Sequence, residues 1–149
     1  MESTRVVPIR LITRNGLKCR DPLADSCNAI PVMDVYLTSP DGSIKNRKSC
    51  TALVDTGADT CIATAGLLSA VGAIRGRDIE QSTANGSSTV HLAETILFFP
   101  SIRLDFRTDF TAVAAIGSPA YQLVIGRTFL QHGVLVMDYP NSVFEWRMP

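Results

Sequence analysis

Residues 52–60 read Ala-Leu-Val-Asp-Thr-Gly-Ala-Asp-Thr and are the most informative segment of the chain. Its three leading apolar residues are typical of a short buried strand, which ends abruptly at Asp55-Thr56-Gly57. The sequence therefore predicts a carboxylate at the end of a strand. An ordinary turn also uses Asp and Gly for conformational reasons, so this motif alone does not separate a catalytic site from a turn.

A second segment, Leu123-Val124-Ile125-Gly126-Arg127, is another apolar run that ends in glycine. A polar hairpin candidate lies between the two segments. In this order the segments resemble those of the retropepsin-like aspartic proteases, the family that contains the retroviral proteases and their cellular and bacterial relatives. The resemblance covers residues 31–146 and implies an aspartic-type endopeptidase.

The resemblance implies a mainly β fold, the half-barrel of an acid protease with two short helices, a flap hairpin and a ψ-shaped loop around the active site. Local patterns favour the same elements. One helix is predicted between Thr64, its N-cap, and Gly72, its C-terminal stop, and a second of little more than one turn at 128–132. Asn85-Gly86 is a strong hairpin signal, so residues 79–90 are expected to form the flap.

The remaining elements are predicted strands. Residues 31–54 are expected to form a hairpin, because Ser39-Pro40-Asp41-Gly42-Ser43 has strong turn chemistry between two β-prone runs. Residues 31–149 are expected to form one protease domain, and residues 1–30 an N-terminal arm or an edge strand. Further strands are predicted at 95–99, 102–106, 110–116, 123–125, 134–137 and 143–146.

The composition of the chain limits the kinds of partner that are expected. The chain has 149 residues, 46% of them hydrophobic, which is enough for one domain with its own core. Fourteen basic residues balance fourteen acidic ones, so no long-range positive field favours nucleic acid. The longest uncharged stretches, 60–74 and 110–126, are too short for a membrane span.

The N-terminus and the cysteines bear on compartment and metal binding. Arg5, Arg10 and Arg14 interrupt residues 1–17, which therefore do not resemble a secretory signal. The four cysteines form no Cys-x-x-Cys pair and lie far in sequence from the two histidines, so neither a metal nor another cofactor is expected. We predict free thiols in a cytoplasmic or otherwise intracellular protein, with a Cys19–Cys27 disulfide left open.

Peptide hydrolysis by carboxyl groups requires two of them. Two carboxyl groups that share one proton can activate a water molecule and protonate the scissile carbonyl oxygen. Asp55 supplies one carboxyl per chain, so the resemblance implies a symmetric homodimer in which the two Asp55 residues meet. The expected substrate is an extended segment of a peptide or protein.

The resemblance also assigns supporting roles around Asp55. Thr56 is expected to hydrogen-bond across the two-fold axis to the partner loop, and Gly57 to let the backbone approach closely. Asp59 and Arg127 match positions that form a buried ion pair between the active-site loop and the short helix. The supporting residues are therefore Thr56, Gly57, Ala58, Asp59, Gly126 and Arg127.

Substrate contacts are expected from both walls of the cleft. Leu53 and Val124 match pocket-lining positions, with plain core as the alternative for both, and Asp59 is expected to accept a hydrogen bond from the substrate backbone. The flap is expected to contribute Asn85, Gly86, Ser87 and Ser88 to substrate binding, and these residues are more polar than those of retroviral flaps.

Ala58 bears on the pH dependence. It stands where pepsin-type enzymes usually carry a hydroxyl that lowers the carboxyl pKa, so activity is expected at mildly acidic to near-neutral pH.

The sequence also predicts a dimer interface and leaves two alternative functions open. The dimer interface is expected at the terminal strands, with Val143–Trp146 as the apolar candidate. Two other functions fit the same residues. One is a dimeric module that binds peptide or protein without cutting it, and the other is a protease limited to releasing itself from a precursor.

Overall fold

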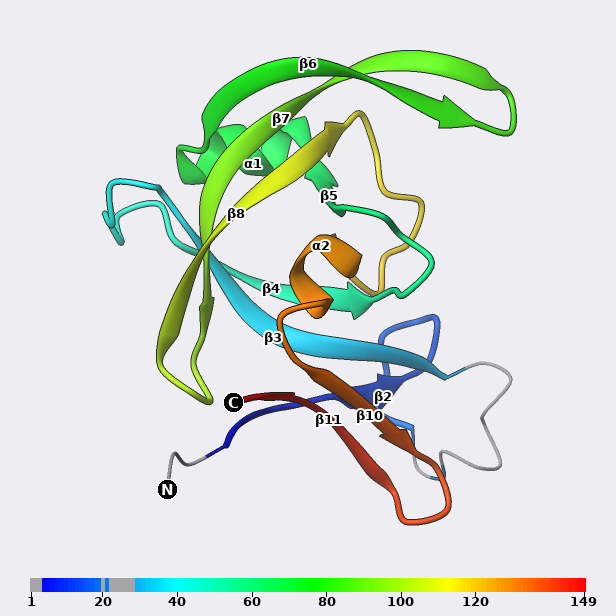
Figure 1. The fold of residues 1–149 in the computed structure, drawn as a ribbon. Helices are drawn as coiled ribbons and strands as arrows, with labels where there is room; N and C mark the ends of the chain where they lie inside the picture. The colour runs from blue at the N-terminus through cyan, green and yellow to red at the C-terminus, as the bar shows by residue number, and fades with distance from the viewer. Residues whose placement is uncertain (1–3, 20, 22–28) are drawn as a thin grey trace.

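The computed structural model describes residues 4–19, 21 and 29–149, which form two β-sheets and two short helices (Figure 1). The small sheet has the strand order β1-β11-β10, and the large sheet has the order β2-β3-β4-β9-β5-β8-β7-β6. The small sheet comprises β1 (Arg5–Pro8), β10 (Val134–Asp138) and β11 (Val143–Met148). The large sheet comprises β2 (Arg10–Ile12), β3 (Ile30–Thr38), β4 (Lys48–Val54), β5 (Cys61–Thr64), β6 (Ile74–Thr83), β7 (Gly86–Phe99), β8 (Leu104–Val113) and β9 (Leu123–Ile125).

The mainly β architecture is confirmed, and its central feature is the insertion of β9 between β4 and β5. β9 runs parallel to β4, with Leu53 beside Val124, and antiparallel to β5, with Ile62 beside the same Val124. The loop that joins β4 to β5 therefore passes around the end of β9. This is the predicted ψ-shaped arrangement, and it places residues 55–60 at the end of three adjacent strands.

Helix α1 (Ala65–Val71) is confirmed together with both of its predicted ends. The Thr64 hydroxyl accepts a hydrogen bond from the Leu67 amide at 3.2 Å, as an N-cap does. Gly72 ends the helix in the left-handed conformation, with φ of 83°, which favours glycine. Leu68 and Val71 face the core.

Helix α2 (Arg127–Leu130) is as short as expected but begins and ends earlier than the predicted residues 128–132. Gly126 is its N-cap residue. Phe129 lies in a cluster of aromatic rings whose centroids are 4.9–6.5 Å apart, and the indole of Trp146 donates a hydrogen bond to the Leu130 carbonyl at 3.2 Å. The cluster comprises Phe99, Phe106, Phe129 and Trp146.

The flap hairpin is formed by β6 and β7, which project from the top of the molecule (Figure 1). Thr83 pairs with Gly86, so the turn consists of Ala84 and Asn85, and Gly86 begins β7 with φ of 121°. Asn-Gly was predicted to form the turn itself, whereas the structure shifts the turn back by one residue. The side chains of residues 84–89 are exposed.

Strands β7 and β8 are longer than predicted. β7 continues from the flap through Phe99, and β8 (Leu104–Val113) joins parts of the two strands predicted at 102–106 and 110–116. Residues 102–103 and 114–116 lie outside it, contrary to the prediction. The prediction took Arg107 and Asp109 as a break, but both are exposed and alternate with partly buried residues along β8. Charges on the solvent face of a strand do not interrupt it, because alternate side chains point to opposite faces.

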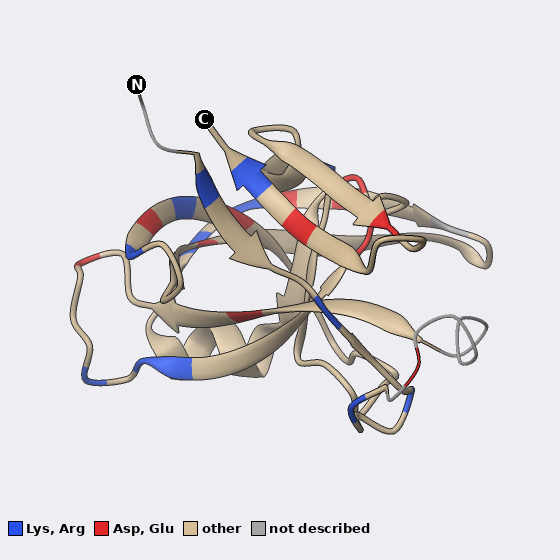
Figure 2. Ribbon diagram, turned by 90° about the horizontal axis from the view of Figure 1, so that it is seen from below, with Lys and Arg blue, Asp and Glu red and all other residues tan. Residues whose placement is uncertain are grey.

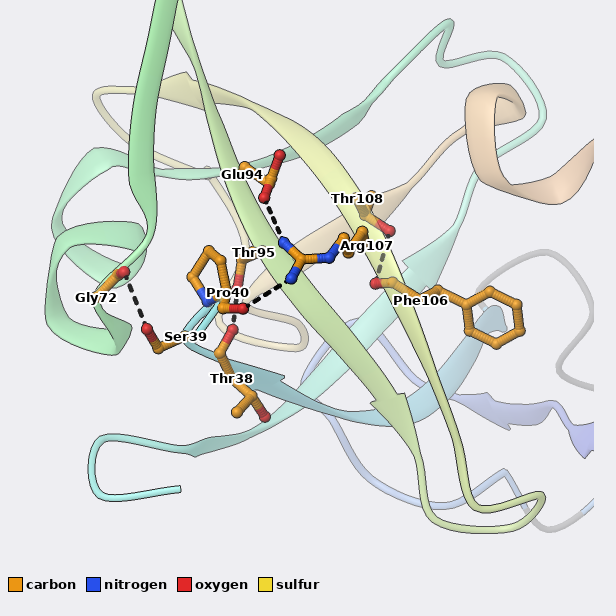
Figure 3. A network of polar contacts seen from close by, with 9 residues as sticks. All are labelled: Thr38, Ser39, Pro40, Gly72, Glu94, Thr95, Phe106, Arg107 and Thr108. Atoms are coloured by element: carbon orange, nitrogen blue, oxygen red, sulfur yellow. Dashed lines mark hydrogen bonds and ion pairs between the residues drawn. The ribbon is translucent and has the colours of Figure 1, made fainter. Parts of the chain in front are cut away.

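A polar network fixes the second half of β7 to the rest of the large sheet (Figure 3). The buried Thr95 hydroxyl donates to the Thr38 carbonyl at 2.6 Å. The guanidinium of Arg107 bridges the Glu94 carboxylate at 2.7 Å and the Pro40 carbonyl at 3.1 Å. These contacts join β7 and β8 to the end of β3 and to the loop that follows it in the predicted β3–β4 hairpin.

The first described residues connect the two sheets. β1 pairs with β11, and β2 pairs with β3. The predicted boundary between an N-terminal arm, residues 1–30, and the protease domain, residues 31–149, stays a prediction. The disulfide left open between Cys19 and Cys27 stays untested, because Cys27 lies outside the described residues. Neither helix among the described residues is long and apolar enough to cross a membrane.

Candidate active site

Asp55 stands directly after β4 and is anchored through its backbone. Its amide donates to the Ile125 carbonyl of β9 at 3.0 Å, so the position of the residue is tied to the ψ-shaped arrangement. The side chain is half-buried, and the Gly57 amide donates to its Oδ1 at 2.8 Å. One carboxylate oxygen therefore has a backbone donor within the loop.

Helix α2 fixes the far side of the same loop. The Arg127 amide donates to the Ala58 carbonyl at 2.9 Å, and the Thr128 amide donates to the Asp59 carbonyl at 3.1 Å. The Arg127 guanidinium also donates to the Thr56 carbonyl at 2.7 Å. These bonds join residues 56–59 to the beginning of α2, although the two segments are far apart in sequence.

Gly126 permits this close approach. A Cβ atom at Gly126 would lie 2.2 Å from the Thr60 carbonyl oxygen and 2.8 Å from that of Ala58. Both neighbours are backbone atoms, which cannot move without displacing the loop. The glycine is thus required by the packing of residues 123–127 against residues 52–60.

The ion pair between Asp59 and Arg127 is present, but the prediction that it is buried is wrong for the single chain. The Arg127 guanidinium donates to Asp59 Oδ1, while 82% of the Asp59 side chain and 53% of the Arg127 side chain are exposed. Water screens such a pair, so it contributes little to the stability of one chain.

An apolar row crosses the face of the sheet next to Asp55. Leu53, Val124 and Ile62 are neighbours in register on β4, β9 and β5. Val124 is buried, and the other two are partly buried. The structure thus brings together the two predicted pocket residues and adds Ile62, which sequence reasoning missed. The sequence signal that could have revealed Ile62 is its alternation with Cys61 and Ala63, which are buried.

A second missed contact closes the end of the loop. The hydroxyls of Thr60 and Thr111 are 2.9 Å apart and share a hydrogen bond. Thr111 is buried near the end of β8. No sequence signal reveals this pair, because it depends on the parallel pairing of β5 with β8.

Comparison with solved structures identifies the fold. A crystal structure of a retropepsin-like aspartic protease from Rickettsia conorii matches with a TM-score of 0.54 and 15% identity, over 98% of this chain and 94% of that one. The chain has a retropepsin-like fold. EIAV protease, solved with the inhibitor HBY-793, matches with a TM-score of 0.49 and 19% identity, over 72% of this chain and 93% of its own. No family model and no curated protein matches the sequence.

The predicted site residues lie in two separate parts of the structure. Residues 53–59 and 124–127 are brought together around β9 by the contacts described above. Asn85, Gly86, Ser87 and Ser88 lie instead at the exposed end of the β6–β7 hairpin, on the side of the molecule where the loop between β4 and β5 lies in Figure 1. Their contact with substrate stays a prediction.

A cavity of about 420 Å³ opens beside the end of the loop and does not include Asp55. Its walls come from β7, β8, α2, the end of the loop and the segment after α2, and they comprise Thr60, Leu92, Phe106, Arg107, Thr108, Asp109, Thr128, Phe129 and His132. At Cys61, the first residue of β5, burial raises the pKa of the thiol above its ordinary value. Among the described residues, no three His, Cys, Asp or Glu side chains gather in a way that could hold a metal ion.

Proposed function

We propose that the chain is an aspartic endopeptidase that acts as a symmetric homodimer on extended peptide segments. The observation that carries the proposal is the position of Asp55 at the end of β4, where its backbone is bonded to β9 and its loop to α2. A turn that served only to reverse the chain would not need these contacts with a distant segment. The retropepsin-like fold supports the same conclusion.

Two Asp55 carboxyl groups, one from each copy, would share one proton. The ionised carboxylate accepts a proton from the attacking water, and the protonated carboxyl donates to the scissile carbonyl oxygen. No covalent intermediate forms. Neighbouring like charges oppose simultaneous ionisation, so one carboxyl stays neutral while the other is charged.

The residues around Asp55 fit supporting roles in this reaction. The Gly57 amide holds one carboxylate oxygen, and the exposed Thr56 side chain is available to a partner loop. The apolar row of Leu53, Val124 and Ile62 offers a surface for apolar substrate side chains. The exposed Asp59 carboxylate is available to the substrate backbone.

Replacement of Asp55 by Asn tests the proposal. Asn keeps the size of the side chain but cannot act as the base, so cleavage of a mixed peptide library should fall by about 10³-fold or more. Asp105→Asn, the same change at an exposed position on β8, is the matched control and should retain activity. A statine-type transition-state mimic should block cleavage by the wild-type chain.

The outcomes also separate the alternative functions. An Asp55→Asn chain that cuts as well as the wild type would contradict the aspartic mechanism. If wild-type protein binds peptides without cleaving any of them, the binding module is the better description. Sequencing the N-termini of wild-type and Asp55→Asn products from a longer precursor would detect a protease limited to its own release.

Ala58 provides a second test, through the pH dependence. A hydroxyl at this position is expected to donate a hydrogen bond to the ionised Asp55 carboxylate and so to stabilise the ionised form. The Ala58→Ser variant should therefore keep its activity to lower pH than the wild type, which is seen as an acid limb of the pH–rate profile displaced to lower pH. A wild-type optimum as acidic as that of pepsin would contradict the role given to Ala58.

A further inference from the structure

The cavity of about 420 Å³ beside the end of the Asp55 loop borders the edge of strand β8. Four consecutive residues of β8, Phe106–Asp109, line it. Alternate side chains of a strand point to opposite faces, so a cavity that touches four residues in a row cannot lie on one face alone. The cavity therefore follows one edge of β8.

The backbone of β8 is unpaired along part of this edge. On one side, β7 pairs with β8 from Leu104 to Ala112. On the other side, β5 pairs with β8 only from Phe110 to Val113. Among the residues that the structure describes, no strand lies beside residues 104–109 on that second side. The outward N–H and C=O groups of such a segment are a template on which an extended peptide can add a strand.

The same cavity adjoins the proposed active site. Thr60, the last residue of the Asp55 loop, lines it. The hydroxyl of Thr60 lies 2.9 Å from that of Thr111, so the end of the loop is bonded to β8. Thr60 directly follows Asp59, which is proposed to contact the substrate backbone. A peptide that passes Asp59 can therefore continue along the unpaired edge of β8.

The cavity wall contains a carboxylate without a counter-ion. Asp109 and Glu94 are opposite each other in register, so their side chains share one face of the sheet. The Arg107 guanidinium on this face donates to Glu94 at 2.7 Å and to the Pro40 carbonyl at 3.1 Å, and Figure 3 shows it directed toward these two residues. No ion pair or hydrogen bond with any described residue engages the exposed Asp109 carboxylate. The charge of Asp109 is thus uncompensated.

This negative charge acts locally. Figure 2 shows Lys and Arg interspersed with Asp and Glu over the ribbon, and fourteen of each kind leave the chain without net charge. Salt also screens exposed charges beyond about 10 Å at an ionic strength of about 0.1 M. Leu92 lines the cavity on the same face of the sheet as Asp109. Together they suit a lysine or arginine side chain, which combines an apolar stem with a cationic head.

We propose that the cavity binds a segment of the peptide substrate distant from the scissile bond, as a strand added to β8, and that Asp109 selects a lysine or arginine in it. The inference rests on the proposed function, because the peptide reaches the cavity from the Asp55 loop. Leu92 supports the apolar stem, and the Asp109 carboxylate binds the cationic head. Asp109 is therefore a specificity-determining residue for peptides with a basic residue away from the cleaved bond.

Cleavage of a mixed peptide library tests the selection. The sites cut by the wild-type chain should be enriched in lysine or arginine at one position distant from the scissile bond, and Asp109→Asn should abolish the enrichment. Asp105→Asn is the matched control, because Asp105 is exposed on the same strand but does not line the cavity. It should keep the enrichment. Equal enrichment in the wild-type and Asp109→Asn chains would overturn the inference.

A pair of peptides measures the size of the effect. One carries lysine at the enriched position, and the other carries norleucine, which keeps most of the stem without the charge. The lysine peptide should have a KM about three- to five-fold lower, as an exposed ion pair provides, and the difference should shrink in about 1 M salt. At about pH 7.5, the imidazole of His132 in the cavity wall stays mostly uncharged.

Charge reversal distinguishes a direct contact from a disturbed fold. Asp109→Lys should prefer a glutamate peptide over the lysine peptide, which a merely unfolded or distorted chain would not do. A lysine preference that persists in Asp109→Lys, or one confined to kcat, would contradict binding at Asp109. Circular dichroism should show that both Asp109 variants are folded.

Methylation of the peptide backbone tests the added strand. The inactive Asp55→Asn chain binds the labelled lysine peptide without cutting it, and fluorescence anisotropy gives the dissociation constant. N-methylation of successive amides in the distant segment should weaken binding by about three-fold at alternate positions, since only alternate residues of a strand bond to a given neighbour. Unchanged affinity at every position would overturn the pairing with β8.

The two proposals fail in different ways. If the wild-type chain cuts the library and no distant position is enriched in basic residues, the selection by Asp109 is wrong and the proposed function stands. If the chain cuts no peptide, but binds the lysine peptide more tightly than the norleucine peptide and loses this difference in Asp109→Asn, the cavity is supported and the proposed function is contradicted.

Discussion

The Asp55 loop and the flap hairpin are held in opposite ways. Residues 55–60 bond to β9 and α2 through backbone groups, and Gly126 leaves no room for a larger residue beside them. The end of the β6–β7 hairpin depends on pairing between its own two strands, and its side chains are exposed. A substitution in the loop therefore disturbs a packed contact, whereas a substitution in the flap meets mostly solvent.

This difference predicts which region tolerates change. Packed backbone contacts make stability sensitive to a single methyl group, because protein interiors have few voids. Exposed hairpin residues contribute to stability through backbone conformation and contact with solvent. Their replacement should therefore affect substrate recognition more than folding. Four substitutions test this difference between the loop and the flap.

The largest effect is expected from Gly126→Ala. The new methyl group would overlap the Thr60 and Ala58 carbonyl oxygens, so the free energy of unfolding should fall by about 3 kcal/mol or more, with loss of activity. Urea denaturation followed by fluorescence measures it. Gly117→Ala, where the methyl group meets open space, should stay within about 0.5 kcal/mol of wild type. Equal stability of the two variants would contradict the packed loop.

The next effect concerns the hydroxyl pair at the end of the loop. Thr60→Val should cost about 2 kcal/mol of unfolding free energy, because it leaves the buried Thr111 hydroxyl without its partner. The double variant Thr60→Val, Thr111→Val should cost less than the sum of the single changes. Additive losses in this double-mutant cycle would show that the two hydroxyls do not interact.

A smaller effect is expected at the flap. Gly86→Ala should lower the unfolding free energy by about 1 kcal/mol, because φ of 121° strains an alanine although nothing crowds its methyl group. Gly66→Ala in α1 also meets open space, and should instead raise stability by about 0.5 kcal/mol through helix propensity. A loss at Gly86 as large as that at Gly126 would remove the contrast between flap and loop.

The smallest effect is expected at the exposed ion pair. Asp59→Asn should change the unfolding free energy of the monomer by about 0.5 kcal/mol, as exposed pairs usually do. Asp34→Asn breaks the similarly exposed pair with Arg10 and is the control. A loss of about 3–5 kcal/mol in dilute protein would mean that the pair is buried after all.

The parts of the fold that depend on neighbouring residues were predictable from the sequence. Thr64 and Gly72 define α1 because capping is a local property, and the turn at residues 39–43 defines the β3–β4 hairpin for the same reason. The connection between the Asp55 loop and Gly126 was available only through the resemblance. Its physical cause, the carbonyl contacts of Gly126, becomes visible once the two segments are side by side.

The remaining features depend on pairing between distant strands. The apolar composition of β11 indicated an interface, but pairing with both β1 and β10 makes it the middle of a sheet. Ile62 joins the apolar row only because β9 lies next to β5. The exposure of Asp59 and of its partner Arg127 likewise becomes visible only once the loop and the start of α2 lie side by side. None of these relations is encoded in a local pattern.

Strand β7 has an exposed part in the flap and a buried part in the core. Its first residues are exposed in the flap, while Ala93, Thr95 and Leu97 are buried beside β3 and β8. Amide hydrogen exchange should therefore be fast near Gly86 and slow near Leu97, with the change close to the network that holds Glu94 and Thr95 (Figure 3). A peptide bound under the flap would slow exchange in the outer half of the strand and leave the protected half as it is.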